Sequence, residues 1–401
     1  MKGGGIMKAV FVHSHIFKYD NDYNFYSDGK LTYQMWEQRY LKYFDNLIVA
    51  ARAKRKLGEN LNISSGNRVE HIILPSLSKI KGRYKNKSDL KKKLKTVIEG
   101  SDALIARMPS EHAYLAIKIA KRLNKPYTVE IVGDVFSSFW THGSVVGKLL
   151  APIYYFKYRK VIKQSAYLIY VTKNNLQKKY PYNSSASFTN ISNVDLPSVS
   201  DLILFNRLSK INKLDVRKEV NIGLIGSYSS KYKGIDRAIK SIKQLNSKGL
   251  KCNLIVLGEG NNRWLLDLSK KLNVENNVVF LGSLPGGKEV FEWLDNIDLY
   301  IQPSLTEGLP RSLIEAMSRG LPCVASSVGG IPELIDKKFI HNPKSYKELS
   351  EKIFYLLSNK KLMLEQAKKN YSYSKSYTSD VLNERRKDFW VNFNHKEFSG
   401  K

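Results

Sequence analysis

Short apolar runs recur along the first half of the chain, and most of them are separated by segments with the periodicity of amphipathic helices. Short apolar runs bounded by turn residues are typical of buried strands. The predicted strands cover residues 9–12, 47–50, 69–74, 103–106, 127–132 and 167–171. Strands that alternate with helices in this way predict a parallel, doubly wound sheet.

The alternation breaks off between residues 196 and 218, where Pro197 and several Ser and Asn residues make the pattern irregular. We place the connection between two domains there, because domain linkers commonly have this composition. A second series of predicted strands covers residues 220–225, 252–257, 278–281, 299–301 and 323–325. The sequence therefore predicts an α/β protein with one domain over residues 1–200, a second over 217–375 and a C-terminal helix over 376–401.

The composition is that of an ordinary folded protein. A chain of 401 residues with 42% hydrophobic and 25% charged residues can form two domains with separate cores. The apolar runs are shorter than a helix that crosses a bilayer. Cys252 and Cys323 lie far apart and show neither disulfide nor metal-ligand spacing. We therefore expect a reducing compartment, namely the cytoplasm.

The net charge of +30 exceeds what solubility requires and indicates an anionic partner. Residues 1–200 carry an excess of +19. The densest basic run begins at Lys79 and ends at Lys95, with nine Lys and Arg among seventeen residues. One interpretation of this run is a solvated helix and loop. The other is contact with an anionic membrane surface, where each basic residue adds about 1 kcal/mol of attraction.

Residues 147–163 mix aromatic and aliphatic side chains with Lys and Arg, as a helix at a membrane interface does. A helix that faces the protein core is the alternative interpretation. Nucleic acid is disfavoured as the anionic partner, because no helix-turn-helix, zinc finger or RNP-like motif accompanies the charge. We expect a peripheral protein on the inner face of the plasma membrane.

Two carboxylates stand where an apolar strand gives way to a helix. Residues 298–302 predict a buried strand, a turn follows, and Glu307 and Glu315 lie on either side of the predicted helix start. The free N–H groups at a helix start favour an anion such as a diphosphate. Glu315 stands in an apolar run, where a carboxylate needs hydrogen-bond partners such as ribose hydroxyls. In the alternative interpretation, Glu307 only caps the helix and Glu315 binds an Arg or a backbone group.

Together with Gly329-Gly330-Ile-Pro-Glu333 and Lys233-Gly234-Ile-Asp236, this segment resembles the signature of glycosyltransferase family 4. The resemblance is specific over residues 221–335 and weaker over the first half. It implies the GT-B fold, in which two Rossmann-like, doubly wound domains face each other across a cleft. It also implies that the C-terminal helix over residues 376–401 returns to the first domain. It also implies a nucleotide-sugar donor, held by the second domain, and transfer with retention of the anomeric configuration.

The resemblance implies roles for particular residues. Glu307 and Lys233 are expected beside the donor's sugar and diphosphate, and Glu315 beside its ribose. Ser227 stands where the family usually has an Arg, so Lys233, Lys231 and the helix N-terminus would have to neutralise the phosphates. Further donor contacts are expected from Gly308, Leu309, Arg311, Ser312, Ser227, Gly29 and Leu284.

Many relatives carry an active-site His after the strand over residues 127–132, and this chain has none there. Asp134 is the candidate polar group in its place. The family's retaining reaction is pictured as front-face attack, in which the leaving diphosphate takes the acceptor proton and no general base is needed. The protein then stabilises charge and orients the substrates. Asp20-Asn-Asp22 lies in a polar loop, so we expect no metal and no other cofactor.

The sequence thus predicts a retaining hexosyltransferase that moves a sugar from a UDP- or GDP-sugar to a lipid-linked oligosaccharide or polysaccharide, as in O-antigen and lipopolysaccharide synthesis. The first domain would bind the acceptor. Two alternatives remain open. A nucleotide-sugar epimerase or hydrolase of the same fold would act without an acceptor, and a non-enzymatic basic protein would bind nucleic acid.

Overall fold

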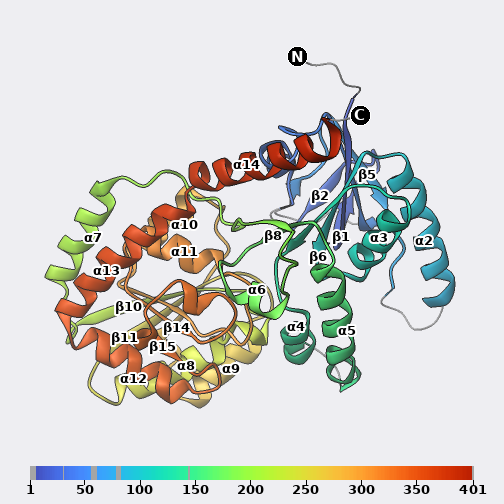
Figure 1. Cartoon of the computed structure of the whole chain (residues 1–401). Coiled ribbons are helices and arrows are strands. Elements are labelled where there is room, and N and C mark those ends of the chain that lie inside the picture. The colour runs from blue at the N-terminus through green and yellow to red at the C-terminus, as the bar shows by residue number, and fades with distance from the viewer. Residues whose placement is uncertain (1–5, 30, 56–60, 78–82, 143–144, 400–401) are drawn as a thin grey trace.

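The computed structural model describes residues 6–29, 31–55, 61–77, 83–142 and 145–399 of the chain. These residues form two α/β domains that lie side by side, each built on a sheet with helices packed against it (Figure 1). The first sheet contains β1 to β9 and the second β10 to β15. The predicted α/β fold class is confirmed.

The first sheet has a parallel part in the order β5-β3-β1-β6-β7-β8-β9. Beyond a bulge, the long central strand β1 also pairs with the antiparallel strand β2, which pairs with β4. The six strands predicted here are confirmed, whereas β2, β4 and β9 were missed because they are short and give no apolar run. The strands are β1 (Lys8–Tyr19), β2 (Phe25–Ser27), β3 (Asn46–Arg55), β4 (Asn62–Ile63), β5 (Val69–Ile73), β6 (Ala103–Met108), β7 (Tyr127–Ile131), β8 (Tyr167–Tyr170) and β9 (Ser187–Asn190).

The second sheet is parallel throughout, in the order β12-β11-β10-β13-β14-β15. Its interior strands β13 and β14 are buried at every position, which explains their largely apolar sequences. The five strands predicted here are confirmed, and the two-residue strand β15 was missed. The strands are β10 (Glu219–Ile225), β11 (Lys251–Leu257), β12 (Val278–Gly282), β13 (Leu299–Gln302), β14 (Cys323–Ser326) and β15 (Ile340–His341).

Helices connect the strands and bury their apolar faces against the sheets. In α8, for example, the buried residues recur at helical spacing, at Ile235, Ala238, Ile239, Ile242 and Leu245. The first domain contains α1 (Tyr33–Arg39), α2 (Arg83–Glu99), α3 (Glu111–Arg122), α4 (Val135–His142), α5 (Val145–Lys163) and α6 (Asn175–Lys179). The second contains α7 (Asp201–Lys213), α8 (Ile235–Asn246), α9 (Arg263–Lys271), α10 (Lys288–Asn296), α11 (Arg311–Ser318), α12 (Tyr346–Leu357) and α13 (Lys360–Ser374). Short 3₁₀ helices include η1 (Lys231–Lys233), η3 (Ile331–Glu333) and η5 (Lys375–Tyr377).

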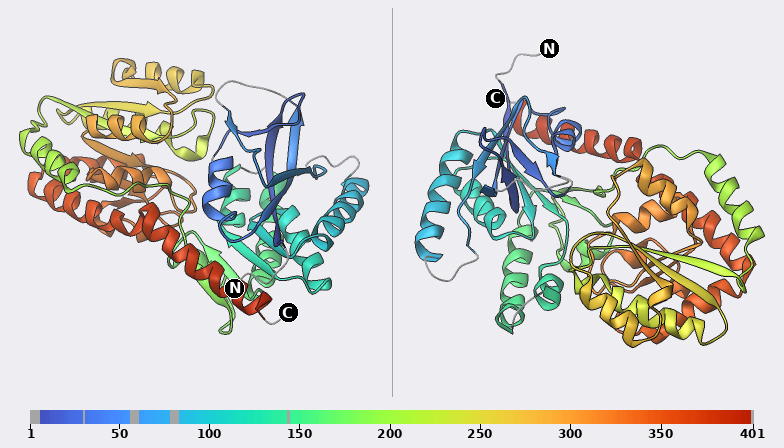
Figure 2. Two further views of the ribbon diagram at one scale, coloured as in Figure 1. Left: turned by 90° about the horizontal axis from the view of Figure 1, so that it is seen from above. Right: turned by 180° about the vertical axis from the view of Figure 1, so that it is seen from behind.

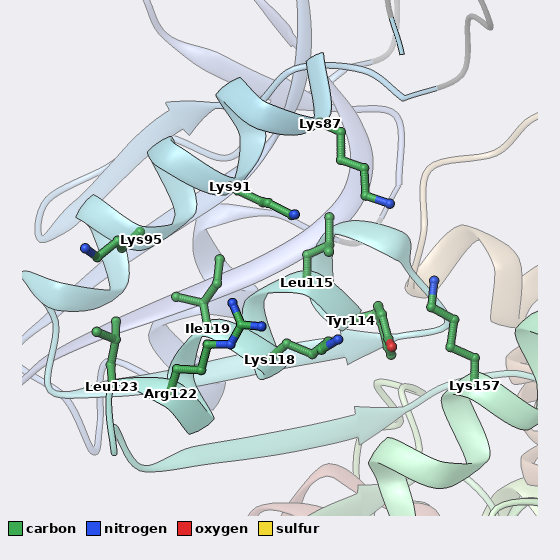
Figure 3. Close-up of a pocket in the computed structure, with 10 residues that line it drawn as sticks. All are labelled: Lys87, Lys91, Lys95, Tyr114, Leu115, Lys118, Ile119, Arg122, Leu123 and Lys157. Carbon is green, nitrogen blue, oxygen red and sulfur yellow. The ribbon is translucent and has the colours of Figure 1, made fainter. Parts of the chain in front are cut away.

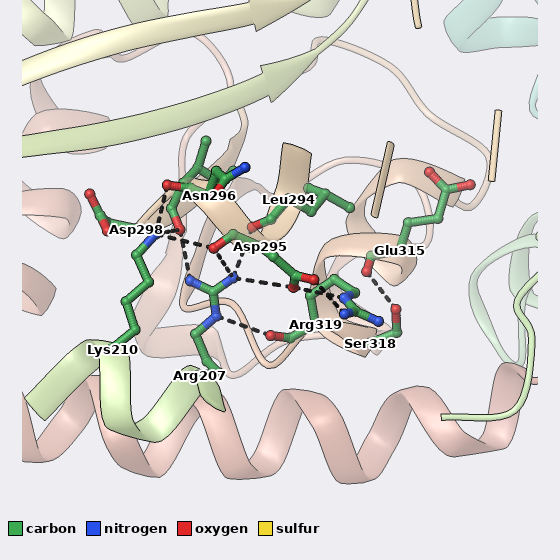
Figure 4. A network of polar contacts seen from close by, with 10 residues as sticks. Arg207, Lys210, Leu294, Asp295, Asn296, Asp298, Glu315, Ser318 and Arg319 are labelled. Atoms are coloured by element: carbon green, nitrogen blue, oxygen red, sulfur yellow. Dashed lines mark hydrogen bonds and ion pairs between the residues drawn. The ribbon is translucent and has the colours of Figure 1, made fainter. Parts of the chain in front are cut away.

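The predicted irregular connection over residues 196–218 is wrong in its central part, which forms α7 and packs against α13. The buried guanidinium of Arg207 fastens this helix by donating to backbone oxygens of Leu294 and Ile297, at 2.8 and 2.7 Å (Figure 4). A contact between an Arg and backbone carbonyls leaves no trace in the hydrophobic pattern, so the pattern did not reveal the helix.

The chain passes between the domains twice, before α7 and again before α14 (Ser379–Phe398). The two crossings touch, because Ser379 N donates to Leu196 O at 2.7 Å and Ser379 Oγ to Asp195 Oδ1 at 2.9 Å. Helix α14 then runs along the first domain (Figure 2). Its Trp390 packs edge-on against Phe44, with ring centres 5.2 Å apart.

Candidate functional site

A cleft of about 560 Å³ opens at the carboxyl ends of the second sheet's strands, where parallel sheets of this kind bind their ligands. The loops after β10, β11, β12 and β13 line it together with the start of α11. The first domain contributes Gln34 from α1 and Asp195 from the segment after β9. The cleft therefore lies between the two domains and has polar groups on both sides.

Glu307 brings a charged group to the floor of this cleft. Three donors converge on its Oε1 atom, namely Lys233 Nζ at 2.8 Å, Ser304 Oγ at 2.9 Å and Gln302 Nε2 at 3.2 Å. In the described part of the chain no donor lies within hydrogen-bond distance of the other oxygen, Oε2. One oxygen is thus fixed by the protein, and the second can accept from a ligand.

A series of hydrogen bonds between buried polar side chains links Glu307 to α11. Gln302, at the end of β13, accepts from Tyr300 OH at 2.8 Å and from Ser312 Oγ at 3.0 Å. Its amide nitrogen donates to Ser304 Oγ at 2.8 Å. Buried polar side chains that are fully hydrogen-bonded specify a single arrangement. The strand end, the turn and the helix start are therefore fixed relative to one another.

Helix α11 begins at Arg311, and its start lines the cleft next to Glu307. Free N–H groups and the helix dipole favour an anion at this position. Burial lowers the pKa of the Arg311 guanidinium, and the carboxylate of Glu315 one turn later opposes that shift. Figure 4 shows the Glu315 carboxylate directed away from the Arg207 network, and the residue lines the cleft.

Gly308 brings the two domains into direct contact. A Cβ atom at this position would lie 2.3 Å from the carbonyl oxygen of Val132 in the first domain, closer than side-chain atoms can approach. The next residue, Leu309, packs against apolar residues of both domains. Only glycine permits this close approach of the two backbones.

Glu333 joins the domains from the other direction. Its carboxylate, at the end of η3 in the second domain, accepts from the backbone N–H groups of Lys173 at 2.7 Å and Asn174 at 3.0 Å, and also from that of Asn175. These groups open α6 of the first domain. Sequence reasoning used Glu333 only as part of the family signature and missed this contact between domains.

The expected donor contacts separate into two sets. Lys233, Glu307, Glu315, Leu284 and the start of α11 line one cleft. The other set, Ser227, Gly29 and Gly308, is not among the residues that line it. Ser227 Oγ donates to Glu259 O at 3.2 Å, and Gly29 N donates to Ser27 Oγ at 3.0 Å next to β2. A role for Gly29 in a loop at the donor stays a prediction.

Asp134 is engaged within the first domain and does not line the cleft. Its carboxylate accepts from Lys179 Nζ and Tyr180 OH, both at 2.7 Å, and from Ser137 Oγ at 2.6 Å. Burial acts to raise the pKa of Asp134, but these hydrogen bonds outweigh it and the pKa lies below its ordinary value. The structure thus gives Asp134 a place at the start of α4; a role in orienting the acceptor stays a prediction.

Several residues that line the cleft could not be recognised from the sequence. Gln34 and Asp195 come from segments far apart in the sequence, so only the fold brings them together. Phe291 is partly buried on α10 and adds an apolar surface near Leu284. The amphipathic pattern of α10 predicts a buried face for Phe291, but not that a ligand site adjoins it.

Among the described residues, no group of three or more His, Cys, Asp or Glu side chains is placed to hold a metal ion. Metal independence stays a prediction. The described helices also include none that is both long and apolar enough to cross a membrane.

Comparisons with known proteins match this geometry. Residues 207–373 match the family described as glycosyl transferases group 1. Protein CapJ of Staphylococcus aureus is 35% identical over 391 residues, which cover 96% of each chain. The N,N'-diacetylbacillosaminyl-diphospho-undecaprenol alpha-1,3-N-acetylgalactosaminyltransferase of Campylobacter jejuni is 29% identical over 157 residues, or 38% of this chain and 40% of the other.

The crystal structure of HepE from Anabaena in complex with UDP-glucose superposes on this chain with a TM-score of 0.66. The superposition covers 96% of this chain and 100% of HepE at 17% sequence identity. It confirms the overall fold, whose two domains enclose a cleft.

Proposed function

The chain belongs to the glycosyl transferases of group 1 and has the GT-B fold, and we propose that it moves a sugar from a nucleoside-diphosphate donor to a lipid-linked saccharide. The observation that carries this proposal is the Lys233–Glu307 pair beside the start of α11, in a cleft lined by both domains. The binding of UDP-glucose by HepE supports a UDP-sugar as the first donor to test, with GDP-sugars as the second.

The cleft offers a separate surface to each part of such a donor. The diphosphate would lie between Lys233 and the N–H groups at the start of α11, which together supply positive charge. The ribose would donate to Glu315. The base would pack against Leu284 and Phe291, whose apolar surfaces lie at one side of the cleft.

In the proposed reaction the acceptor oxygen forms a bond to the anomeric carbon as the bond from that carbon to the β-phosphate oxygen breaks. The hydroxyl proton passes to the departing phosphate oxygen. Attack from the face that the phosphate leaves retains the anomeric configuration. Lys233 and the start of α11 would stabilise the negative charge on the phosphate, without a metal or other cofactor. Glu307 Oε2 would accept from a hydroxyl of the transferred hexose and fix its orientation.

We assign acceptor binding to the first domain, whose Gln34 and Asp195 face the donor residues across the cleft. The Campylobacter jejuni relative is named for an acceptor carried on diphospho-undecaprenol, which supports a lipid-linked saccharide. A growing polysaccharide, as in O-antigen or lipopolysaccharide synthesis, belongs to the same class of acceptor.

A lipid-linked acceptor implies that the enzyme works at a membrane, and we propose peripheral attachment to its cytoplasmic face. The basic run from Lys79 to Lys95 supports this location. Residues 79–82 lie outside the described part, and residues 83–95 belong to α2.

A thermal-shift screen with UDP- and GDP-sugars tests donor binding, because a ligand that binds only the native state raises Tm. Transfer assays with the stabilising donor and a lipid-linked saccharide follow, and NMR couplings of the product give its anomeric configuration. Turnover of the donor without an acceptor would instead indicate an epimerase or hydrolase. Salt-sensitive binding of DNA or RNA with no nucleotide-sugar binding would indicate the non-enzymatic alternative.

A further inference from the structure

A groove between α2 and α3 collects cationic side chains around a cavity of about 480 Å³ (Figure 3). This volume is typical of small-ligand sites. Residues spaced four apart lie on one face of a helix, so the α2 and α3 cations point into the same space. We call it the basic groove; its cations are Lys87, Lys91 and Lys95 of α2, Lys118 and Arg122 of α3, and Lys157 of α5.

Few carboxylates balance these charges. Lys157 Nζ lies 3.6 Å from Glu111, and Lys95 Nζ lies 3.5 Å from Glu99. In the described part of the chain, no carboxylate lies within 4.0 Å of the other four cations. A concave surface with charges of one sign concentrates its field and attracts counter-ions. The ligand of the basic groove is therefore an anion.

The rest of the groove lining is apolar, from Tyr114, Leu115, Ile119 and Leu123 of α3 (Figure 3). Inorganic phosphate would gain nothing from apolar contacts. A phosphate esterified to glycerol and acyl chains gains from both parts of the lining, because its hydrocarbon is removed from water. The cations of the lining therefore match the phosphate of a phospholipid, and its apolar residues match the adjoining hydrocarbon.

Helix α5 carries an exposed apolar stripe on the face opposite its buried residues. The side chains of this stripe are between 60% and 75% exposed, whereas Tyr158 and Ile162 on the other face are buried. The core-facing interpretation of residues 147–163 is confirmed for the buried face, and the membrane-interface interpretation stays a prediction for the exposed one. The members of the α5 stripe are Val145, Val146, Leu149, Ile153 and Phe156.

The α5 stripe and the basic groove adjoin at Lys157. This residue follows Phe156 of the stripe, and its Nζ lies 4.3 Å from the ring centre of Tyr114 in the groove. Figure 1 shows α4 and α5 extending beyond the rest of the first domain. Basic side chains beside an apolar helix face are the combination that holds a helix in a bilayer interface.

We propose that the basic groove binds the phosphate of an anionic phospholipid while the α5 stripe enters the same bilayer. This deepens the membrane attachment in the proposed function and rests on it for the choice of partner. The proposal gives the lysines of the basic run different roles. Lys91 and Lys95 line the groove, whereas Lys93 Nζ donates to Ile73 O at 3.2 Å.

The charge test uses the full chain and two kinds of vesicle, phosphatidylcholine alone and its equimolar mixture with phosphatidylglycerol. The Lys91→Glu, Lys118→Glu double variant should bind the mixed vesicles about tenfold more weakly or worse. The matched control is Lys270→Glu with Lys271→Glu, an equal change of charge on exposed α9 residues of the second domain, and it should bind as the parent protein does. An equal loss in the control would show that only net charge matters and would overturn the groove assignment.

The insertion test replaces Leu149 and Phe156 with Ser. Vesicle binding should fall severalfold and become more sensitive to salt, because the remaining attraction is electrostatic. The control replaces Leu202 and Phe205 of α7, which are 63% and 68% exposed, and should leave binding unchanged. A dimeric parent protein that becomes monomeric in the stripe variant, with vesicle binding intact, would make the stripe a protein interface and overturn the proposal.

Two further measurements separate the possible failures. Inorganic phosphate at millimolar concentration should leave Tm and vesicle binding unchanged; competition at that concentration would make the groove a free-phosphate site and overturn the lipid assignment. The Tm increase given by UDP is recorded for every variant. Vesicle binding that depends on the groove in a protein that no nucleotide stabilises would refute the donor proposal and leave the lipid site in place.

Discussion

Lys233 Nζ lies 2.8 Å from Glu307 Oε1, so the loop after β10 and the loop after β13 meet in one ion pair at the cleft. The Lys233 side chain is 19% exposed and that of Glu307 is 11% exposed. A pair so sheltered from water loses much more when one partner is removed than a surface pair does. The two residues therefore have to be tested together as well as singly.

Glu307→Gln should lower the transfer rate by tenfold or more, a rise of roughly 1.4 kcal/mol in the barrier. Gln keeps an acceptor oxygen but removes the charge that positions Lys233. The effect should fall mainly on kcat, and the double variant with Lys233→Met should lose less than the sum of the single losses. Glu351→Gln, at an exposed position on α12, is the control. Unchanged turnover in folded Glu307→Gln would remove Glu307 from the donor site.

Glu315→Gln should mainly weaken nucleotide binding, again by about tenfold. The carboxylate is the expected acceptor for ribose hydroxyls, and it also favours the charged form of half-buried Arg311. Calorimetric titration with UDP measures the affinity directly. Equal affinity in the variant and the parent protein would contradict the ribose assignment.

Asp134→Asn separates a structural from a functional role. The substitution removes the negative charge to which Lys179 and Tyr180 donate. Its loss should lower the free energy of unfolding by about 1–3 kcal/mol. If Asp134 also orients the acceptor, the acceptor KM should rise more than kcat falls. Normal kinetics in a destabilised variant would leave only the structural role. Asp267→Asn on the surface of α9 serves as the control.

Glu333→Gln should loosen the contact between the domains, because three backbone N–H groups of the first domain donate to this carboxylate. Hydrogen bonds to a charged acceptor are worth about 1.5–3 kcal/mol, more than bonds to a neutral amide. We expect a larger radius of gyration by small-angle scattering and faster proteolysis between the domains. Identical scattering for Glu333→Gln, Glu365→Gln and the parent protein would show that the contact does not hold the domains together.

Stability should fall as the pH drops from 6.5 towards 4. Burial lowers the pKa of His71 from its ordinary 6.5 to about 4, so in this range the unfolded chain binds a proton that the folded protein does not. The stabilisation is complete above pH 6.5 and is lost at up to about 1.4 kcal/mol per pH unit. His71→Phe preserves the stacking on Phe25 and should flatten the dependence. Chemical denaturation at several pH values measures this dependence.

The hydrophobic pattern predicted the central strands because these are buried on both sides, as β13 and β14 are throughout. The edge strands β4, which is exposed, and β9, which is mostly half-buried, depend on their neighbours and leave no such pattern. Helix α7 was missed for a related reason, since buried Arg207 fastens it through backbone oxygens.

The part of the site within one strand-turn-helix segment was accessible from sequence, because Glu307, Arg311 and Ser312 are close along the chain. Asp195 was not, because its position at the cleft depends on how the two domains meet. The position of Asp134 also could not be read from the sequence, and its role stays a prediction. Its location after a strand suggested the cleft, but Lys179 and Tyr180 draw its carboxylate into the first domain.

The hydrogen bond from Ser379 N to Leu196 O makes the two chain crossings into one pivot. When two bodies turn about one point, they move least near that point and most at a distance from it. Asp195 accepts a hydrogen bond from Ser379 and also lines the cleft, so one edge of the cleft lies at the pivot itself. Rotation about the pivot would therefore change that edge very little while opening the more distant parts of the cleft. Such a rotation would admit larger acceptors from the side of the cleft that lies away from Asp195.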